Sequence, residues 1–265
     1  MLESSKLRVG GRDVPTLLKS ALQPRHYTAL LNMARTYDHP LEMLQRYLTG
    51  SGQYPFTARV KAPTGLLQIP LYSHHDLLTV NEIFCRKDYG APAPVKRVVD
   101  FGSNIGISGL YFLSNDPSAR VHLFEPVPSN VERLERTLEG YEGRYQLHAV
   151  AIGIEDGEVE FGLEPTGRYG GIGQATTQSI RVPCQHVNTA LSEVFQDPFF
   201  DQIDVLKVDI EGYEAKVVSA IAPEHLARIR NIFAEIETDP PRLPGFDQDR
   251  YGPIVRWKRV ARTSQ

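Results

Sequence analysis

From residue 95 to residue 237, short apolar runs rich in β-branched residues alternate with segments of helical periodicity. The runs expected to form strands are 95–101, 120–125, 145–152, 203–208 and 231–237. Helices are expected between them, where apolar residues recur at helical spacing, at 105–114, 127–138 and 213–221. Strands and helices that alternate with short connections form right-handed crossovers, which place the strands in a parallel sheet. The sequence therefore predicts an α/β fold.

Residues ahead of this region follow a different pattern, so the sequence predicts two domains, 1–94 and 95–265. In the first domain, helical spacing dominates over 24–50, a strand is expected near 66–72, and a helix is expected over 76–86. We interpret this domain as a mainly helical extension that covers the site of the second domain.

Two further runs in the second domain, 158–163 and 180–186, alternate apolar and polar residues. We expect them to pair as antiparallel strands, because this alternation is typical of strands with one buried face. The segment between them is rich in glycine, a composition that suits a mobile loop. We expect this loop to act as a lid over the site and to be open to proteases near Arg168.

Composition and charge limit the partners of this chain of 265 residues. A hydrophobic content of 41% and a charged content of 23% are typical of a globular protein. The net charge of −3 gives no excess of cations for nucleic acid, and no apolar run approaches the roughly 18 residues that span a membrane. The first residues lack the apolar core of a secretory signal, so we expect a cytoplasmic protein that acts on a small molecule. A homodimer is left open.

The most informative motif follows the first strand of the second domain, where Asp100, Gly102, Asn104 and Gly106 stand at alternate positions. Ligands of doubly wound sheets lie beyond the carboxyl ends of the strands, where glycine permits a positive φ or the close approach of a ligand. Glu125 ends the second strand, and an acid there can accept two hydrogen bonds from the vicinal hydroxyls of a ribose. The two features together predict a nucleoside-binding site.

This nucleoside is not expected to be a nicotinamide dinucleotide. The Gly-x-Gly-x-x-Gly fingerprint, started at Gly102, has Asn104 and Ile107 where it requires glycine. An acid such as Asp100 at the strand end repels a pyrophosphate but suits a cationic amino group. S-adenosylmethionine has such a group and a ribose, so it is the expected cofactor. A nicotinamide-dependent oxidoreductase or epimerase, and a non-catalytic nucleoside-binding subunit, are the alternatives.

Charged residues also end the strand expected at 203–208. Lys207 and Asp209 point to the same face of that strand, and Glu211 and Glu214 follow at the start of the next helix, where the helix dipole favours carboxylates. A lysine and an aspartate at the end of an apolar strand are costly to bury unpaired, so they form either a buried ion pair or a group that faces the substrate. Acids on the neighbouring strand end make a divalent ion conceivable, but no spacing selects a ligand set, and no metal is predicted.

Three blocks of sequence resemble the FkbM family of methyltransferases: VVDFGSNIG at 98–106, LFEPVPSN at 123–130 and IDVLKVDIEGYE at 203–214. The resemblance covers about residues 95–240. It implies the class I S-adenosylmethionine-dependent methyltransferase fold, which is Rossmann-like, with a mostly parallel seven-stranded sheet that contains one antiparallel strand. It also implies a cofactor site made of Asp100, Gly102, Ser103, Asn104 and Gly106 at the methionine end, Glu125 at the ribose, and Pro126 in the turn beside the adenosine.

On these grounds the sequence predicts an enzyme that transfers the methyl group of S-adenosylmethionine to a hydroxyl of a small secondary metabolite or a sugar. Such an in-line displacement requires chiefly that the protein aligns the reactants. A general base that removes the hydroxyl proton adds a factor of about 10²–10⁴. We expect Asp209 to be this base, with Glu211 as the second choice and Lys207 as the third member of the catalytic set.

Overall fold

The computed structural model describes residues 8–9, 12–13, 24–92, 94–163, 171–172, 178–237 and 239–260. The chain forms two compact units, Met1–Asp88 and Tyr89–Gln265, with a boundary slightly ahead of the one expected from the sequence. Among the helices of the described residues, none combines the length and the apolar character needed to cross a membrane.

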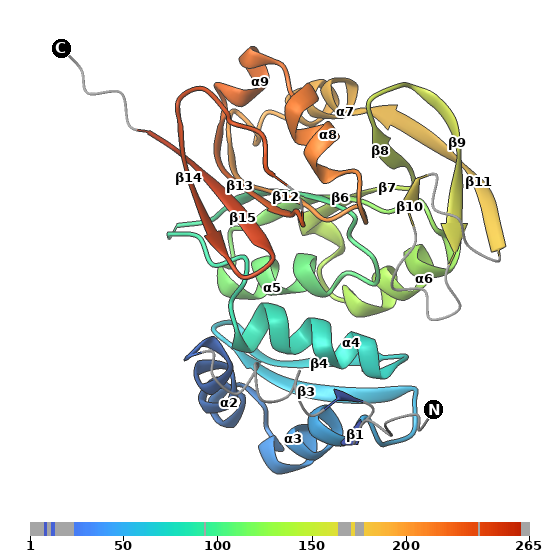
Figure 1. Cartoon of the computed structure of the whole chain (residues 1–265), viewed down its shortest axis with the longest axis vertical. Coiled ribbons are helices and arrows are strands. Elements are labelled where there is room, and N and C mark those ends of the chain that lie inside the picture. Colours follow the sequence, from blue (N-terminus) through green and yellow to red (C-terminus); the bar gives the residue numbers. More distant parts are fainter. Residues whose placement is uncertain are drawn as a thin grey trace, which may run out of the picture. The chain divides into compact units, whose positions relative to one another are not determined.

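The first unit combines helices with a β-hairpin (Figure 1). Its elements are β1 (Arg8–Val9), β2 (Arg12–Asp13), α2 (Pro24–Thr36), α3 (Pro40–Thr49), β3 (Phe56–Ala62), β4 (Gly65–Leu71), α4 (His74–Val80) and the π-helix η1 (Asn81–Cys85). The antiparallel pair β3–β4 buries one face, to which Ala58, Val60 and Ile69 belong. The sequence analysis anticipated β4 and the helix near 76–86 but missed β3, although β3 also alternates polar and apolar residues.

Local signals in the sequence set the ends of these helices. Pro40 lies in the first turn of α3, where its missing N–H leaves no hydrogen bond unmade. Gly50 ends α3 in the left-handed conformation and donates its N–H to the carbonyl of Arg46. Ser73 and Asp76 form a capping box at the start of α4.

The second unit is built on a seven-stranded sheet with the order β14-β15-β13-β12-β5-β6-β7. Its strands are β5 (Arg97–Phe101), β6 (Arg120–Phe124), β7 (Tyr145–His148), β12 (Ile203–Val208), β13 (Ile229–Glu235), β14 (Phe246–Tyr251) and β15 (Ile254–Arg259). β13, β12, β5, β6 and β7 pair in parallel, whereas β15 pairs antiparallel with both β13 and β14. Of the seven strands, only β15 therefore runs against the others. The expected α/β fold with a mostly parallel seven-stranded sheet is confirmed.

Helices cover both faces of this sheet, with α5 and α6 on one side and α7, α8 and α9 on the other (Figure 1). Their bounds are α5 (Ile107–Asn115), α6 (Pro128–Thr137), α7 (Val187–Val194), α8 (Glu214–Ala220) and α9 (Pro223–Leu226), and a 3₁₀ turn, η2 (Glu142–Arg144), precedes β7. One core cluster lies between the sheet and α7–α9, where Val99, Phe101, Leu206 and Val208 of the central strands are fully buried. The central strands are buried on both faces, so they appear in the sequence as mostly apolar runs.

A smaller sheet with the order β10-β9-β11-β8 lies beside the β7 edge (Figure 1). It consists of β8 (Ala151–Gly153), β9 (Gly157–Leu163), β10 (Gly171–Ile172) and β11 (Gln178–His186). The expected antiparallel pair is confirmed as β9–β11. The single strand expected at 145–152 is wrong, because the chain leaves the main sheet after His148 and β8 joins the smaller sheet instead. Most of the glycine-rich segment, including Arg168, lies outside the described residues, so the expected lid stays a prediction.

β6 and β7 bring together a pair of histidines. His122 is buried, and its Nδ1 lies 3.0 Å from Nε2 of His148, so one ring donates and the other accepts. The His148 ring stacks on Phe124 with 4.2 Å between the ring centres. Burial, together with the neighbouring His148, lowers the pKa of His122 to about 4. His122 is therefore neutral at physiological pH and belongs to the core.

Candidate active site

The carboxyl ends of β5 and β12 meet at the centre of the main sheet. The two strands are parallel neighbours, and their register pairs Asp100 with Lys207. The sequence order reverses between these strands, because β6 and β7 lie on one side of β5 while β12 and β13 lie on the other. Ligands of doubly wound sheets bind at such a reversal point.

Lys207 is the centre of a buried charge network at this point. Its Nζ donates to Asp100 Oδ1 at 2.9 Å and to the carbonyl oxygen of Gly102 at 3.0 Å, and it lies 3.5 Å from Asp209 Oδ2. The other oxygen of Asp100 accepts a short hydrogen bond from the hydroxyl of Ser108 in α5. Burial alone would lower the pKa of Lys207, but the two carboxylates raise it above its usual value, so this lysine is charged.

This network changes the roles expected for Asp100 and Lys207. Asp100 is completely buried, and its two oxygens accept hydrogen bonds from Lys207 and Ser108. The expected direct contact between Asp100 and a cationic cofactor stays a prediction. Lys207 is also buried, which assigns both residues to the support of the neighbouring turn and of Asp209. The Asp209 side chain, by contrast, is 29% exposed.

The turn that follows β5 has an unusual backbone. Gly102, Asn104 and Gly106 all have positive φ, with values of 79°, 47° and 83°. A Cβ atom on Gly102 would lie 1.8 Å from the carbonyl oxygen of Asp209. The glycine at this position is therefore required by the close approach of the end of β12, whereas the sequence analysis also considered the close approach of a ligand.

Glu125, at the end of β6, joins this turn to the next one. Its Oε2 accepts from the N–H of Asn104 at 2.9 Å, and its Oε1 accepts from the N–H of Val127 at 3.0 Å and from Nδ2 of Asn130 at 3.2 Å. Burial raises the pKa of Glu125 to about 7, against the opposite effect of these hydrogen bonds. Pro126 is buried between the two turns. Since Asn104 is the one donor to Oε2 within the described part of the chain, this oxygen has capacity for another donor.

The loop between β12 and α8 also has left-handed backbone. Glu211 has a φ of 57° and Gly212 a φ of 94°. The Glu214 carboxylate is buried and accepts from the N–H groups of Ile210 and Gly212, each at 2.9 Å, so Glu214 stabilises the loop from within. Glu211 is only partly buried. Asn104 and Glu211 thus hold the strained conformation of non-glycine residues at two adjacent strand ends, and such strain concentrates at functional sites.

Tyr89 is a member of the site that the sequence analysis missed. Its hydroxyl donates to Asp209 Oδ2 at 3.2 Å, and its ring centre lies 5.5 Å from Nζ of Lys207. The ring also packs edge-on against Phe233 of β13, with 6.1 Å between the ring centres. Tyr89 lies in the segment ahead of β5, which has no periodic pattern and no motif, so no signal in the sequence pointed to it.

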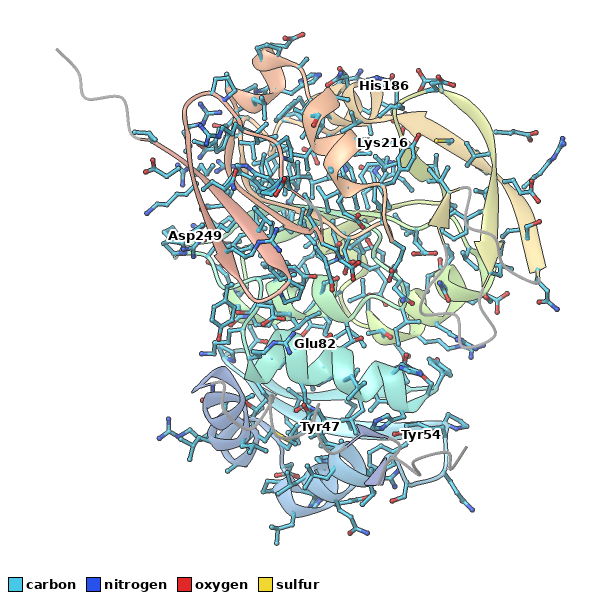
Figure 2. All side chains as sticks on the ribbon, in the orientation of Figure 1. Tyr47, Tyr54, Glu82, His186, Lys216 and Asp249 are labelled. Carbon is cyan, nitrogen blue, oxygen red and sulfur yellow. The ribbon has the colours of Figure 1, made fainter. Side chains whose placement is uncertain are left out.

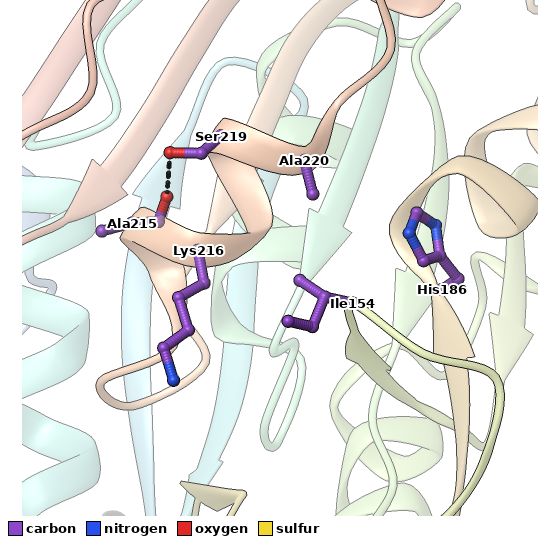
Figure 3. A pocket seen from close by; sticks show the side chains of 6 residues that line it. All are labelled: Ile154, His186, Ala215, Lys216, Ser219 and Ala220. Carbon is purple, nitrogen blue, oxygen red and sulfur yellow. Dashed lines mark hydrogen bonds between the residues drawn. The ribbon is translucent and has the colours of Figure 1, made fainter.

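A hollow of about 560 Å³ lies beside α8 (Figure 3). Its lining residues come from the turn after β8, from the end of β11 and from α8, and they are Ile154, His186, Ala215, Lys216, Ser219 and Ala220. His186 caps α7, because its Nδ1 accepts from the N–H of Asn188 at 3.0 Å. Among the residues described, no three His, Cys, Asp or Glu side chains gather in a way that could hold a metal ion.

Several known proteins are similar to part or most of this chain. Methyltransferase 1 of Beauveria bassiana is 28% identical over 179 residues, which cover 58% of this chain and 71% of that protein. The AMB antimetabolite synthetase AmbE of Pseudomonas aeruginosa is 28% identical over 196 residues, which cover 59% of this chain but only 9% of AmbE. Among solved structures, a putative caffeoyl-CoA O-methyltransferase from Staphylococcus aureus is 10% identical and has a TM-score of 0.43, over 89% of this chain and 99% of that one.

The family comparison covers the site itself. The Methyltransferase FkbM domain matches residues 100–253, which are more than half of the chain. The match begins at Asp100 and includes Glu125, Lys207 and Asp209. The sheet has the seven strands and the single antiparallel strand that the resemblance implied. The chain therefore belongs to the FkbM family of S-adenosylmethionine-dependent methyltransferases.

Proposed function

We propose that the chain is an O-methyltransferase that methylates a hydroxyl of a small molecule. The observation that carries this proposal is the position of Asp209, a partly exposed carboxylate held at the carboxyl ends of the central strands by Lys207 and Tyr89. A carboxylate at this point can accept the proton of a hydroxyl as the methyl group is transferred.

The residues at these strand ends fit S-adenosylmethionine. Glu125 would hold the ribose through the remaining acceptor capacity of its carboxylate, and Pro126 would shape the turn beside the adenosine. The turn from Gly102 to Gly106, with Ser103 and Asn104, would lie along the methionine end. Lys207 is neutralised by Asp100, so the exposed charge of the network is the negative charge of Asp209, which suits a cationic ligand. When bound, S-adenosylmethionine supplies an activated methyl group on a sulfonium.

The protein itself contributes alignment and proton transfer. Asp209 orients the acceptor hydroxyl and takes its proton. Proton removal by a general base increases the rate of such a reaction about 10²–10⁴-fold. Asp100 and Lys207 act indirectly, because they hold Asp209 and the glycine turn in place. Glu211 is the second choice for the base, since it lies two residues further on in the same loop.

The acceptor class is supported by charge and by relatives. The net charge of −3 does not favour nucleic acid as a substrate. AmbE is named as an antimetabolite synthetase, which supports a role in making a small secondary metabolite. Membership in a methyltransferase family removes the basis for the nicotinamide-dependent alternative.

The test is the substitution Asp209→Asn. The asparagine amide oxygen can still accept from Tyr89 and Lys207, so the variant should keep its fold and its affinity for S-adenosylhomocysteine while methyl transfer falls at least 100-fold. Activity is measured with radiolabelled S-adenosylmethionine on a panel of hydroxylated and amine-bearing small molecules, and affinity is measured by calorimetry.

The matched control is Asp249→Asn on the edge strand β14, labelled in Figure 2, where the side chain is 55% exposed and pairs with Arg256. This control should keep full activity. If Asp209→Asn turns over normally, the base role passes to Glu211. If amines are methylated and hydroxyls are not, the O-methyl assignment is wrong. If neither class is methylated although the cofactor binds, the chain is a non-catalytic binding subunit.

A further inference from the structure

In the described part of the chain, two groups contact the Asp209 carboxylate, and both lie near the same oxygen. The Tyr89 hydroxyl lies 3.2 Å from Oδ2, and Lys207 Nζ lies 3.5 Å from Oδ2. Among the described residues, no hydrogen-bond donor contacts Oδ1. Because the side chain is 29% exposed, this unengaged oxygen is the one available to a ligand.

The position of Tyr89 is itself fixed by the sheet. Phe233, Lys207 and Asp100 are register partners across β13, β12 and β5, so their side chains form one row on the same face. The Tyr89 ring lies over this row, edge-on to Phe233 and 5.5 Å from Nζ of Lys207. Tyr89 is only 5% exposed, so the ring cannot turn away without losing these contacts.

A second donor matters because one contact does not fix a carboxylate. With Lys207 alone at 3.5 Å, Asp209 could rotate about its Cα–Cβ and Cβ–Cγ bonds and exchange its two oxygens. Two donors that converge on Oδ2 from different elements restrict this rotation. A displacement that requires the acceptor oxygen, the methyl group and the sulfur in line is sensitive to such restriction.

We propose that Tyr89 is a positioning residue that, together with Lys207, holds Oδ2 of Asp209 so that Oδ1 faces the acceptor hydroxyl. This inference rests on the proposed function of Asp209 as the base. It assigns to the segment before β5 an effect on the rate of methyl transfer that is exerted through Asp209.

The test is Tyr89→Phe, which removes the hydroxyl and keeps the ring over Lys207 and against Phe233. We expect kcat to fall about 10-fold, with the KM for S-adenosylmethionine and the melting temperature unchanged. The control is Tyr251→Phe on β14, a tyrosine that is 43% exposed, which should leave kcat unchanged. A structural readout accompanies the kinetics: in crystals without cofactor, Asp209 should have one side-chain conformer in the wild type and more than one in Tyr89→Phe.

The double variant separates this inference from the proposed function. If Tyr89 acts through Asp209, adding Tyr89→Phe to Asp209→Asn should cause no further loss of kcat. An additional 10-fold loss in the double variant would overturn the inference, as would a Tyr89→Phe enzyme that only binds the cofactor more weakly. If Asp209→Asn alone has no effect, the proposed base is wrong. If Asp209→Asn abolishes activity and Tyr89→Phe does not change it, only the role of Tyr89 is wrong.

Discussion

The turn after β5 lies close to the end of β12, and from this contact we predict how much a substitution of Gly102 destabilises the protein. A Cβ atom there would lie 1.8 Å from the carbonyl oxygen of Asp209 and 3.3 Å from a methyl carbon of Ile210. Because carbon and oxygen atoms do not approach within 3.0 Å in this way, Gly102→Ala must push the two strand ends apart by more than 1 Å. The substitution therefore disturbs the fold at the position that holds Asp209.

Two costs add at this position. Gly102 has a φ of 79°, and the left-handed conformation costs a residue with a Cβ atom about 1–2 kcal/mol. The forced separation is an overpacking cost of about 1–3 kcal/mol. We therefore expect Gly102→Ala to reduce the free energy of unfolding by about 2–5 kcal/mol. Methyl transfer should fall as well, because the backbone of Asp209 moves.

Gly140 is a matched control for the backbone cost. It has a φ of 88°, and a Cβ atom there would have no other atom within 4 Å. Gly140→Ala should therefore cost only the conformational term, about 1–2 kcal/mol, and leave activity unchanged. Both variants are measured by urea denaturation with calorimetric titration of S-adenosylhomocysteine. Equal destabilisation by the two substitutions would show that the close contact with Asp209 does not exist, and a stable, fully active Gly102→Ala would refute the reasoning.

The remaining predictions concern the pH dependence of stability. Burial raises the pKa of Glu125 from 4.5 to about 7. The free energy of unfolding should therefore fall by about 3 kcal/mol as the pH rises through this range. In Glu125→Gln, urea denaturation should show no such fall. Burial lowers the pKa of His122 from 6.5 to about 4. The free energy of unfolding should therefore fall by about 3 kcal/mol as the pH falls from 6.5 to 4, and His122→Gln should not show this fall. Stability curves that run parallel for the wild type and either variant would contradict the corresponding prediction.

The sequence predicted the main sheet because its strands are buried on both faces. Mostly apolar short runs such as 203–208 are typical of the centre of a covered parallel sheet. The run 145–152 was misjudged for a related reason. Both halves can form a strand, and nothing local indicates that His148 ends a strand of one sheet and Ala151 begins a strand of another.

The candidate site was only partly predictable, because its contacts depend on which strands are neighbours. Lys207 and Asp209 lie two residues apart, and the sequence left open whether they form a buried ion pair or face the substrate. The register between β12 and β5 instead gives Lys207 a closer partner in Asp100, more than 100 residues earlier. Tyr89 could not be predicted for the same reason, because its contact partners Asp209 and Phe233 are distant from it in the sequence.

The smaller sheet has a consequence for how members of such a family diverge. Its β8 and β11 are parallel neighbours that pair Gly153 with His186. The two ends of the chain segment between these residues are therefore adjacent. A segment whose two ends are adjacent can lengthen, shorten or be exchanged with little effect on the rest of the fold. This segment buries a small apolar core, and Val127, in the turn after Glu125, packs into that core from outside the segment. Insertions between β9 and β11 are therefore a route by which selection could alter the surroundings of the proposed ribose site while the seven-stranded sheet stays the same.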